Sequence, residues 1–441
     1  MKRIGSILAL LGATLSFNAQ IIHDSTAQRN WTLHAQATVV PQYHFDFKAA
    51  YSGTNSLETS ENVKTSLTST IYIGRRLWKN AALYVNPEVS GGSGLSKTLG
   101  IAGFTNGETF RVGSATPKLY LARAYVEQKF PLTAGTHLLE EDQNQLRQDE
   151  PKEYVAIRAG KFSMDDFFDD NSHSHDPRTD FMNWSLMSAA AWDYPANTRG
   201  YTTGLAMELK KTLWALRAAL VQVPENANGP VLDKNIDKAY GTVIEVERKW
   251  NFKNQQEWII RTGVFYNKAR MGNYQQAIDS GILFFTTPDV TTTRMYSRDK
   301  RGFYLNSEYN GKNGGAFLRY SWNDAKNETW AFTEIDRSFT IGCSFNGSQW
   351  QRKGDKWGAA LAANGLGKDH RTYLQHGGYG FMIGDGNLNY GAEEIIELFY
   401  SYALIYRHVW ISPDYQFVAH PGYNKDRGPV SVIALRLHCE L

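Results

Sequence analysis

Charged residues recur at alternate positions in two early segments of the sequence, where they could bind a polar solute. Glu88 shares one side of the first segment with polar neighbours, and Arg123 and Glu127 share one side of the second. Side chains of a β-strand alternate between two faces, so these groups are expected on a water-facing side. Paired Arg and Glu supply hydrogen-bond donors and acceptors without a large net field. Arg158 is a further candidate, although the two faces of its segment differ little in polarity.

An irregular stretch, residues 165–201, brings aromatic and acidic side chains together. A loop of this length is usually functional or disordered, and its aromatic content favours order. We therefore predict that it folds partly into the space enclosed by the surrounding strands and narrows it. The alternative is an outer cap whose tryptophans pack against a rim. The candidate contact residues in this stretch are Trp184, Trp192, Asp193, Tyr194 and Arg199.

Other reactive residue types occur without the pattern that catalysis or metal binding requires. His173 and His175 stand beside Asp176, but no separate third histidine or cysteine completes a metal site. No GxSxG nucleophile motif is present. The neighbouring carboxylates Glu393 and Glu394 would point to opposite faces of a strand, which gives no catalytic separation. We expect no enzyme activity, no metal and no cofactor.

The elements that position these residues are short alternating segments separated by Gly, Asn and Asp clusters. Aromatic residues make up 13 % of the chain, with 38 Gly and only 13 Pro. No blade-length repeat indicates a propeller. A transmembrane antiparallel β-barrel of about 16 strands explains the pattern, because its apolar row faces lipid and its polar row faces a wet lumen. The predicted strands cover 31–40, 64–73, 81–89, 119–129, 154–162, 202–209, 214–223, 240–248, 258–267, 302–309, 316–322, 338–346, 395–406, 413–419 and 431–441.

The two ends of the chain have different sequence patterns. Residues 1–19 have the basic, apolar, small-residue order of a signal peptide, which leaves a barrel domain of 20–441; cleavage after Ser16 is the alternative. The formal net charge is only +3 and falls when the signal is removed, which gives no reason to expect nucleic acid. Residues 431–441 (SVIALRLHCEL) alternate to the last position, so we predict that they close the barrel against 31–40.

The acidic segment 131–153 is rich in Glu and Asp. Charge-rich connections are usually solvated. We expect a solvated loop there and place no site in it.

Several long blocks resemble one family. Residues 34–57 read HAQATVVPQYHFDFKAAYSGTNSL, and 157–201 read IRAGKFSMDDFFDDNSHSHDPRTDFMNWSLMSAAAWDYPANTRGY. Residues 82–106, PKLYLARAYVEQKF at 117–130 and ISPDYQFVAHPGYN near the end belong to the same pattern. Together they resemble the carbohydrate-selective porins of the OprB type, a Gram-negative outer-membrane family. One departure is the final Leu441, where such chains commonly end in an aromatic residue.

The resemblance implies a 16-stranded barrel with short periplasmic turns, and passive diffusion of mono- or small oligosaccharides. The implied partners are small carbohydrates, outer-membrane lipid and lipopolysaccharide, and the barrel-assembly machinery; the oligomeric state is left open. A sugar offers hydroxyl groups and apolar ring faces, so a selective pore should offer Arg, Glu and aromatic side chains that bind weakly. A barrel with a blocked lumen, acting in surface binding or adhesion, is the alternative. Conductance distinguishes the two.

Overall fold

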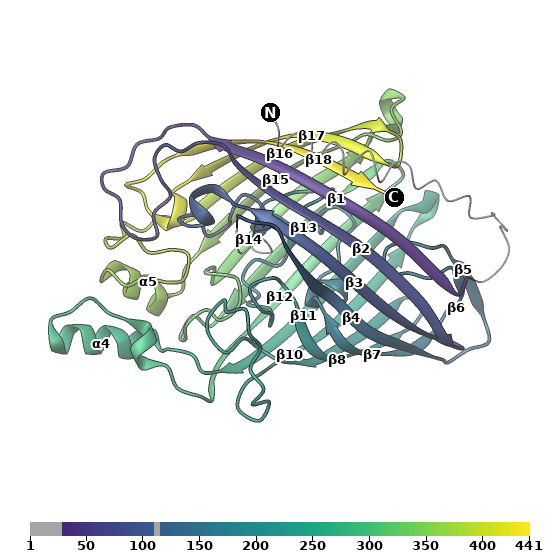
Figure 1. Ribbon diagram of the computed structural model, residues 1–441, viewed down its shortest axis with the longest axis horizontal. Helices are drawn as coiled ribbons and strands as arrows, with labels where there is room; N and C mark the ends of the chain where they lie inside the picture. Colours follow the sequence, from purple (N-terminus) through teal and green to yellow (C-terminus); the bar gives the residue numbers. More distant parts are fainter. Residues whose placement is uncertain (1–28, 110–114) are drawn as a thin grey trace.

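The computed structural model describes residues 29–109 and 115–441. Sixteen strands form one closed barrel in which every neighbouring pair is antiparallel, and β18 closes against β1 (Figure 1). This architecture confirms the predicted fold. The predicted signal peptide, residues 1–19, lies outside the described residues. Within the described ranges, no helix is long and apolar enough to cross a bilayer.

The barrel strands are β1 (Trp31–His44), β2 (Lys64–Trp78), β3 (Ala81–Gly92), β4 (Lys118–Pro131), β7 (Tyr154–Phe162), β8 (Thr202–Lys210), β9 (Trp214–Val221), β10 (Tyr240–Asn251), β11 (Glu257–Ala269), β12 (Arg298–Gly311), β13 (Gly314–Asn323), β14 (Arg337–Asn346), β15 (Lys356–Gly365), β16 (Glu393–Ile405), β17 (Val409–Ala419) and β18 (Val430–Glu440). A separate hairpin consists of β5 (Thr136–Leu139) and β6 (Gln148–Pro151). The connections hold α3 (Trp184–Met187), α4 (Tyr274–Phe284) and α5 (Lys368–Gln375). They also hold the 3₁₀ turns η1 (Leu95–Lys97), η2 (Met164–Asp166), η3 (Lys253–Gln255), η4 (Val290–Thr293), η5 (Gly347–Trp350) and η6 (Pro421–Tyr423).

Alternation along the strands sorts side chains between lipid and lumen. In β18, Ile433 and Leu435 are 42 % and 44 % exposed on the outer face, whereas Arg436 and His438 are 1 % exposed on the inner face. A strand that presents apolar groups to hydrocarbon and polar groups to a wet interior satisfies both environments. Side chains of β10 alternate in the same way, and Glu245 points into the lumen. The polar residues predicted on the wet faces therefore do lie inside.

The seam of the barrel lies where β1 meets β18. Thr38 is opposite His438 in the register, and the Thr38 hydroxyl lies 2.7 Å from Nδ1 of His438. Ala35 and Leu441 exchange two backbone hydrogen bonds, of 3.1 and 2.9 Å. A closed barrel leaves no strand edge without hydrogen bonds in the membrane. The predicted pairing of the terminal strand with the first is confirmed.

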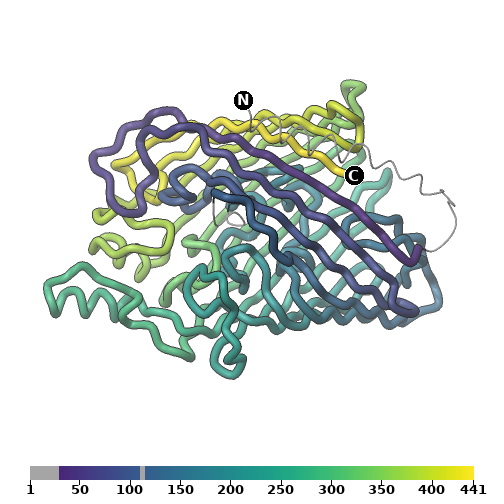
Figure 2. The backbone as a smooth tube through the Cα atoms, viewed as in Figure 1, coloured from purple at the N-terminus to yellow at the C-terminus, as the bar shows by residue number. Residues whose placement is uncertain are grey.

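The two ends of the barrel differ in the length of their connections. Strands such as β2 and β3 are joined by a tight turn at one end, where the chain also finishes, whereas α4 and α5 extend from the other end (Figure 2). Outer-membrane barrels place short turns in the periplasm and long loops outside, so the α4–α5 end faces outward. The hairpin β5–β6 is at the short-turn end.

Two features differ from the predicted elements. Strand β15 was not predicted, because its sequence KWGAALAANG places alanine on both faces and so shows little alternation. The segment 131–153 was predicted as a solvated loop, and that prediction is wrong. It forms the β5–β6 hairpin, in which Leu146 is completely buried.

Candidate pore constriction

The long connection after β7 lies inside the barrel because carboxylates of the wall bind its backbone. The backbone N–H groups of Met182 and Asn183 donate to Glu397 at 2.6 and 2.9 Å. The N–H of Asp169 donates to Glu245 at 2.8 Å. Hydrogen bonds to a charged acceptor are stronger than neutral ones. The predicted inward folding of this loop is confirmed.

Arg319 on β13 holds the same loop from another side of the barrel. Its Nε donates to the Asp169 carboxylate at 3.0 Å, and its two terminal nitrogens donate to the carbonyl oxygens of Leu186 and Ser174 at 2.8 and 2.7 Å. Arg319 is 1 % exposed. The planar guanidinium can serve several acceptors in fixed directions, so this one side chain holds the loop at three residues.

Alternating charges follow the inner wall from β4 to β12. Neighbouring strands contribute Glu and Arg in turn, and each charge is balanced within the wall. Such a ladder offers polar groups without a field of one sign. Predicted residues Glu127 and Arg158 form its first pair, 2.7 Å apart. The further pairs are Arg158–Glu208, Arg217–Glu208, Arg217–Glu245, Arg217–Glu247, Arg261–Glu247 and Arg261–Glu308.

A cavity of about 380 Å³ separates the inward loop from the wall and from the hairpin. A volume near the lower end of the range for small-molecule sites, about 300–1,000 Å³, suits a small solute. We name it the constriction cavity. Its lining from the loop comprises Ser163, Asp165, Asp166, Phe167, His175, Asp176, Pro177, Arg178 and Met187, and from the strands Tyr72, Arg123 and Tyr125. The hairpin contributes Gln143, Asn144 and Gln145.

Arg123 is the predicted residue that the structure places in this lining. Its Nε and Nη2 donate to the two oxygens of Asp166 at 2.7 and 2.5 Å. Its Nη1 is buried and has no hydrogen-bond partner within residues 29–109 and 115–441. The carboxylate therefore fixes the orientation of the guanidinium at the edge of the cavity. Arg123 thus adds a positive charge to the lining, while Nη1 itself is closed off from the cavity.

Glu88 and Arg199 lie near the cavity but outside its lining. Glu88 is fully buried, accepts from the Thr70 hydroxyl at 2.6 Å and pairs with Arg178 at 3.3 Å. Arg199 donates to Ser90 at 3.0 Å and lies 4.0 Å over the ring of Tyr120. Glu88 therefore positions the unpredicted Arg178, which does line the cavity.

The predicted aromatic contacts lie in the core of the folded-in loop. Trp184, Trp192 and Tyr194 are 2 %, 0 % and 4 % exposed and pack with Phe332 in one apolar cluster. Asp193 accepts the N–H groups of Trp330 and Ala331, each at 2.7 Å. Large rings gain most from burial, and this burial removes them from contact with a solute in the cavity. The aromatic surfaces of the cavity are instead Tyr72, Tyr125 and Phe167.

The loop side of the cavity contains two groups with shifted acidity. Burial, together with the nearby Asp169 and Asp166 carboxylates, raises the pKa of Asp165 to about 7. Burial lowers the pKa of His175, but the Asp170 and Asp165 carboxylates outweigh it and the net pKa is raised. The charge of this wall therefore changes near neutral pH.

The histidine pair considered as a metal motif is separated in space. The His173 ring lies 2.9 Å from the Ser344 hydroxyl and 2.7 Å from the Asn310 amide oxygen. His175 lines the constriction cavity. Among the residues that the structure describes, no three His, Cys, Asp or Glu side chains gather as metal ligands.

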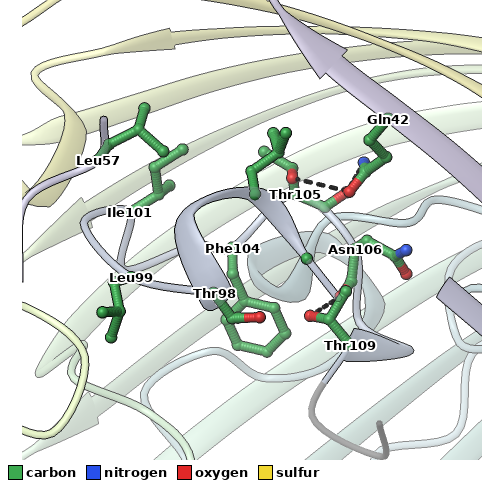
Figure 3. A pocket seen from close by; sticks show the side chains of 11 residues that line it. Gln42, Leu57, Thr98, Leu99, Ile101, Phe104, Thr105, Asn106 and Thr109 are labelled. Atoms are coloured by element: carbon green, nitrogen blue, oxygen red, sulfur yellow. Dashed lines mark hydrogen bonds between the residues drawn. The ribbon is translucent and has the colours of Figure 1, made fainter. Parts of the chain in front are cut away.

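A second inward segment, residues 94–109, packs beside β1 (Figure 3). Gln42 donates to the Thr105 carbonyl at 3.1 Å, and the Thr105 hydroxyl donates back to Gln42 at 3.3 Å. The space left there is about 10 Å³, which holds at most a water molecule. This small pocket is therefore a packing gap and not a solute site.

A closed barrel with an apolar outer surface, a charged inner wall and inward loops defines an outer-membrane channel of the porin class. The family model described as carbohydrate-selective porin, OprB family, matches residues 54–441. The chain belongs to this family and to the outer membrane.

Solved structures show the same fold. The chain is similar to the high-pH structure of Pseudomonas putida OprB, with a TM-score of 0.68 and 14 % identity over 93 % of this chain and 94 % of that one. It is also similar to the outer membrane channel DcaP of Acinetobacter baumannii, with a TM-score of 0.50 and 8 % identity over 93 % and 97 % of the two chains. A comparison with curated proteins gave no match.

Proposed function

We propose that this porin admits neutral mono- and small oligosaccharides across the outer membrane by passive diffusion, without catalysing a reaction. The observation that carries the proposal is the lining of the constriction cavity, where the Arg123–Asp166 pair lies among acidic, amide and aromatic side chains. A sugar presents hydroxyl groups at its edge and carbon at its ring faces. Such a lining matches both parts, in a family whose description is carbohydrate-selective.

The balanced charges of the wall support a preference for neutral solutes. Arg123 is paired with Asp166, and Arg178 is paired with Glu88 and Glu108. Paired charges remain good hydrogen-bonding groups but attract ions of neither sign strongly. Contacts made by a few such groups also stay weak enough for the solute to leave, which flux requires.

Contacts outside the pore belong to the same proposal. The exposed outer row of β18 would meet outer-membrane lipid and lipopolysaccharide, and the alternating terminal strand would be recognised by the barrel-assembly machinery. The terminal Leu441 keeps the apolar row to its end.

Liposome swelling tests the proposal. Vesicles with the purified protein should swell faster in glucose than in an amino acid of similar size. Arg123→Gln should slow glucose uptake by up to about tenfold, because a hydrogen bond to a charged group contributes about 1.5 kcal/mol or more. The double variant Arg123→Gln/Asp166→Asn removes the carboxylate left unpaired, and Arg248→Gln on the exposed outer face of β10 is the matched control.

Two results would count against the proposal. Equal swelling in glucose and the amino acid would remove the sugar preference. A barrel that folds and inserts but does not conduct would favour the alternative, a blocked barrel whose outer loops act in binding or adhesion.

A further inference from the structure

The β5–β6 hairpin is an insertion at the end of the barrel that otherwise has short turns. It occupies residues 132–153 between β4 and β7, whereas β2 and β3 are joined at Lys79 and Asn80. Its strands pair from Thr136 with Pro151 to Leu139 with Gln148. Because the long inward loop enters from the opposite end, the hairpin approaches the lumen from the periplasmic side (Figure 1).

Charged contacts fasten the hairpin to the barrel wall. Glu150 pairs with Lys129 of β4 at 2.5 Å, and Glu141 pairs with Arg29 at 2.8 Å. Arg76 of β2 donates to the carbonyl oxygen of Arg147 at 3.4 Å. Contacts to β4, β2 and the chain before β1 spread the attachment over one side of the barrel.

An apolar anchor sits close to the hairpin tip. Leu146 is 0 % exposed and belongs to the same apolar cluster as Tyr84, Tyr125 and the core of the inward loop. Full burial of a leucine side chain contributes about 1.5–3 kcal/mol. The hairpin is therefore a fixed part of the interior and not a tail that hangs below the barrel.

The tip presents three neighbouring amides, Gln143–Asn144–Gln145, to the constriction cavity. The Asn144 side chain accepts from Asn86 at 2.8 Å, and Gln143 donates to Gln36 at 3.2 Å. These bonds hold the tip against β1 and β3. Each amide has two donors and an acceptor, and the three side chains are only half-buried, so they keep hydrogen-bonding capacity on the cavity side.

The cavity thus has two opposed walls of different origin. The acidic segment 165–178 comes from the outer end, and the uncharged amide tip comes from the periplasmic end. A solute that occupies the space between them contacts both. Since the space is only about 380 Å³, its width depends on the hairpin as well as on the loop.

We infer that the tip Gln143–Asn144–Gln145 is a selectivity element of this channel: it sets the upper size of the solute and hydrogen-bonds to its hydroxyl groups. The hydroxyl part of the inference rests on the proposed sugar function, whereas the size part requires only an open pore. The element acts on neutral polyhydroxylated solutes, because amides give hydrogen bonds without selecting a charge.

Single-channel conductance and liposome swelling of the triple variant Gln143→Ala/Asn144→Ala/Gln145→Ala test the inference. Shortening three side chains widens the space, so conductance in salt alone should rise above that of the wild type. The swelling rate in sucrose relative to glucose should also rise. Gln275→Ala, an exposed amide on α4 at the other end, is the matched control and should change neither value.

A second variant, in which a short Gly-containing turn replaces residues 133–152, should raise conductance further. If this deletion variant fails to insert, the triple alanine variant alone tests the role of the tip. Unchanged conductance and an unchanged sucrose-to-glucose ratio in a folded, inserted triple variant would overturn the inference. A wild-type channel that conducts but shows no sugar preference would contradict the proposed function, while a conductance gain in the variant would still support the size role of the tip.

Discussion

Arg319→Met is the substitution that should loosen the constriction most while leaving the barrel closed. The guanidinium is buried and makes four hydrogen bonds of 2.7–3.2 Å to Asp169, Ser174 and Leu186 of the inward loop. Methionine fills much of the space but donates nothing. It also leaves the Asp169 carboxylate, itself 1 % exposed, without its cation.

The size of the effect follows from the burial of this pair. Removing one partner of a buried, hydrogen-bonded ion pair costs about 3–5 kcal/mol. About 1.4 kcal/mol corresponds to a factor of ten in an equilibrium constant. The equilibrium ratio of docked to undocked loop should therefore fall by about a hundred-fold or more. The strand pairings of β13 with β12 and β14 do not involve this side chain, so the barrel should still assemble.

Planar-bilayer recordings and limited proteolysis read out the change. The open-channel current of the variant should become noisier and larger than that of the wild type. Trypsin should reach Arg178 and Arg199 in the loop, which are buried or packed in the wild type. Arg248→Met, on the exposed face of β10, controls for the loss of a charge. If the currents of Arg319→Met are as quiet as those of the wild type and its loop stays protected from trypsin, Arg319 does not hold the loop in place.

Three further outcomes are expected. Asp165, whose pKa is about 7, is neutral below that pH and negative above it, so the cation-to-anion permeability ratio from reversal potentials should rise between about pH 5 and about pH 9. Asp165→Asn should reduce this rise and leave only the part that comes from deprotonation of His175, whereas Asp279→Asn on α4 should keep the full rise. Trp192→Ala should cost about 3–5 kcal/mol of loop packing and increase protease sensitivity, more than Trp78→Ala, whose ring is 59 % exposed. Leu435→Arg should destabilise the barrel by about 2–4 kcal/mol in folding measurements with lipid vesicles, because it puts a charge on the lipid-facing row.

The barrel could be predicted from the sequence because its chemistry repeats at every second residue. The outer Leu435 and the inner Arg436 of β18 follow directly from the pattern, and so does the inward orientation of Glu127, whereas its pairing with Arg158 depends on the register between two strands. Strand β15 could not be predicted in the same way. Alanine on both faces leaves no contrast between lipid and lumen.

The constriction could be predicted only in part, because loops lack the two-residue alternation of polarity that shows which side chains of a strand face the lumen. Arg123 was predicted because it stands on a strand, whereas Arg178 was not, since its role depends on Glu88 and Glu108 meeting it from elsewhere. The aromatic residues of the long loop indicated order correctly but lie in its core. The hairpin was missed because its many charges conceal Leu146, the one apolar residue that anchors its tip.

Single-channel conductance in salt, with graded additions of glucose and sucrose, shows whether the barrel is an open pore that prefers small sugars. The structure predicts a measurable ion current in salt alone, reduced by glucose in a saturable way at high concentration and affected less by sucrose, which should enter the constriction poorly. An inserted barrel that passes no current, or a current that neither sugar reduces, would contradict it.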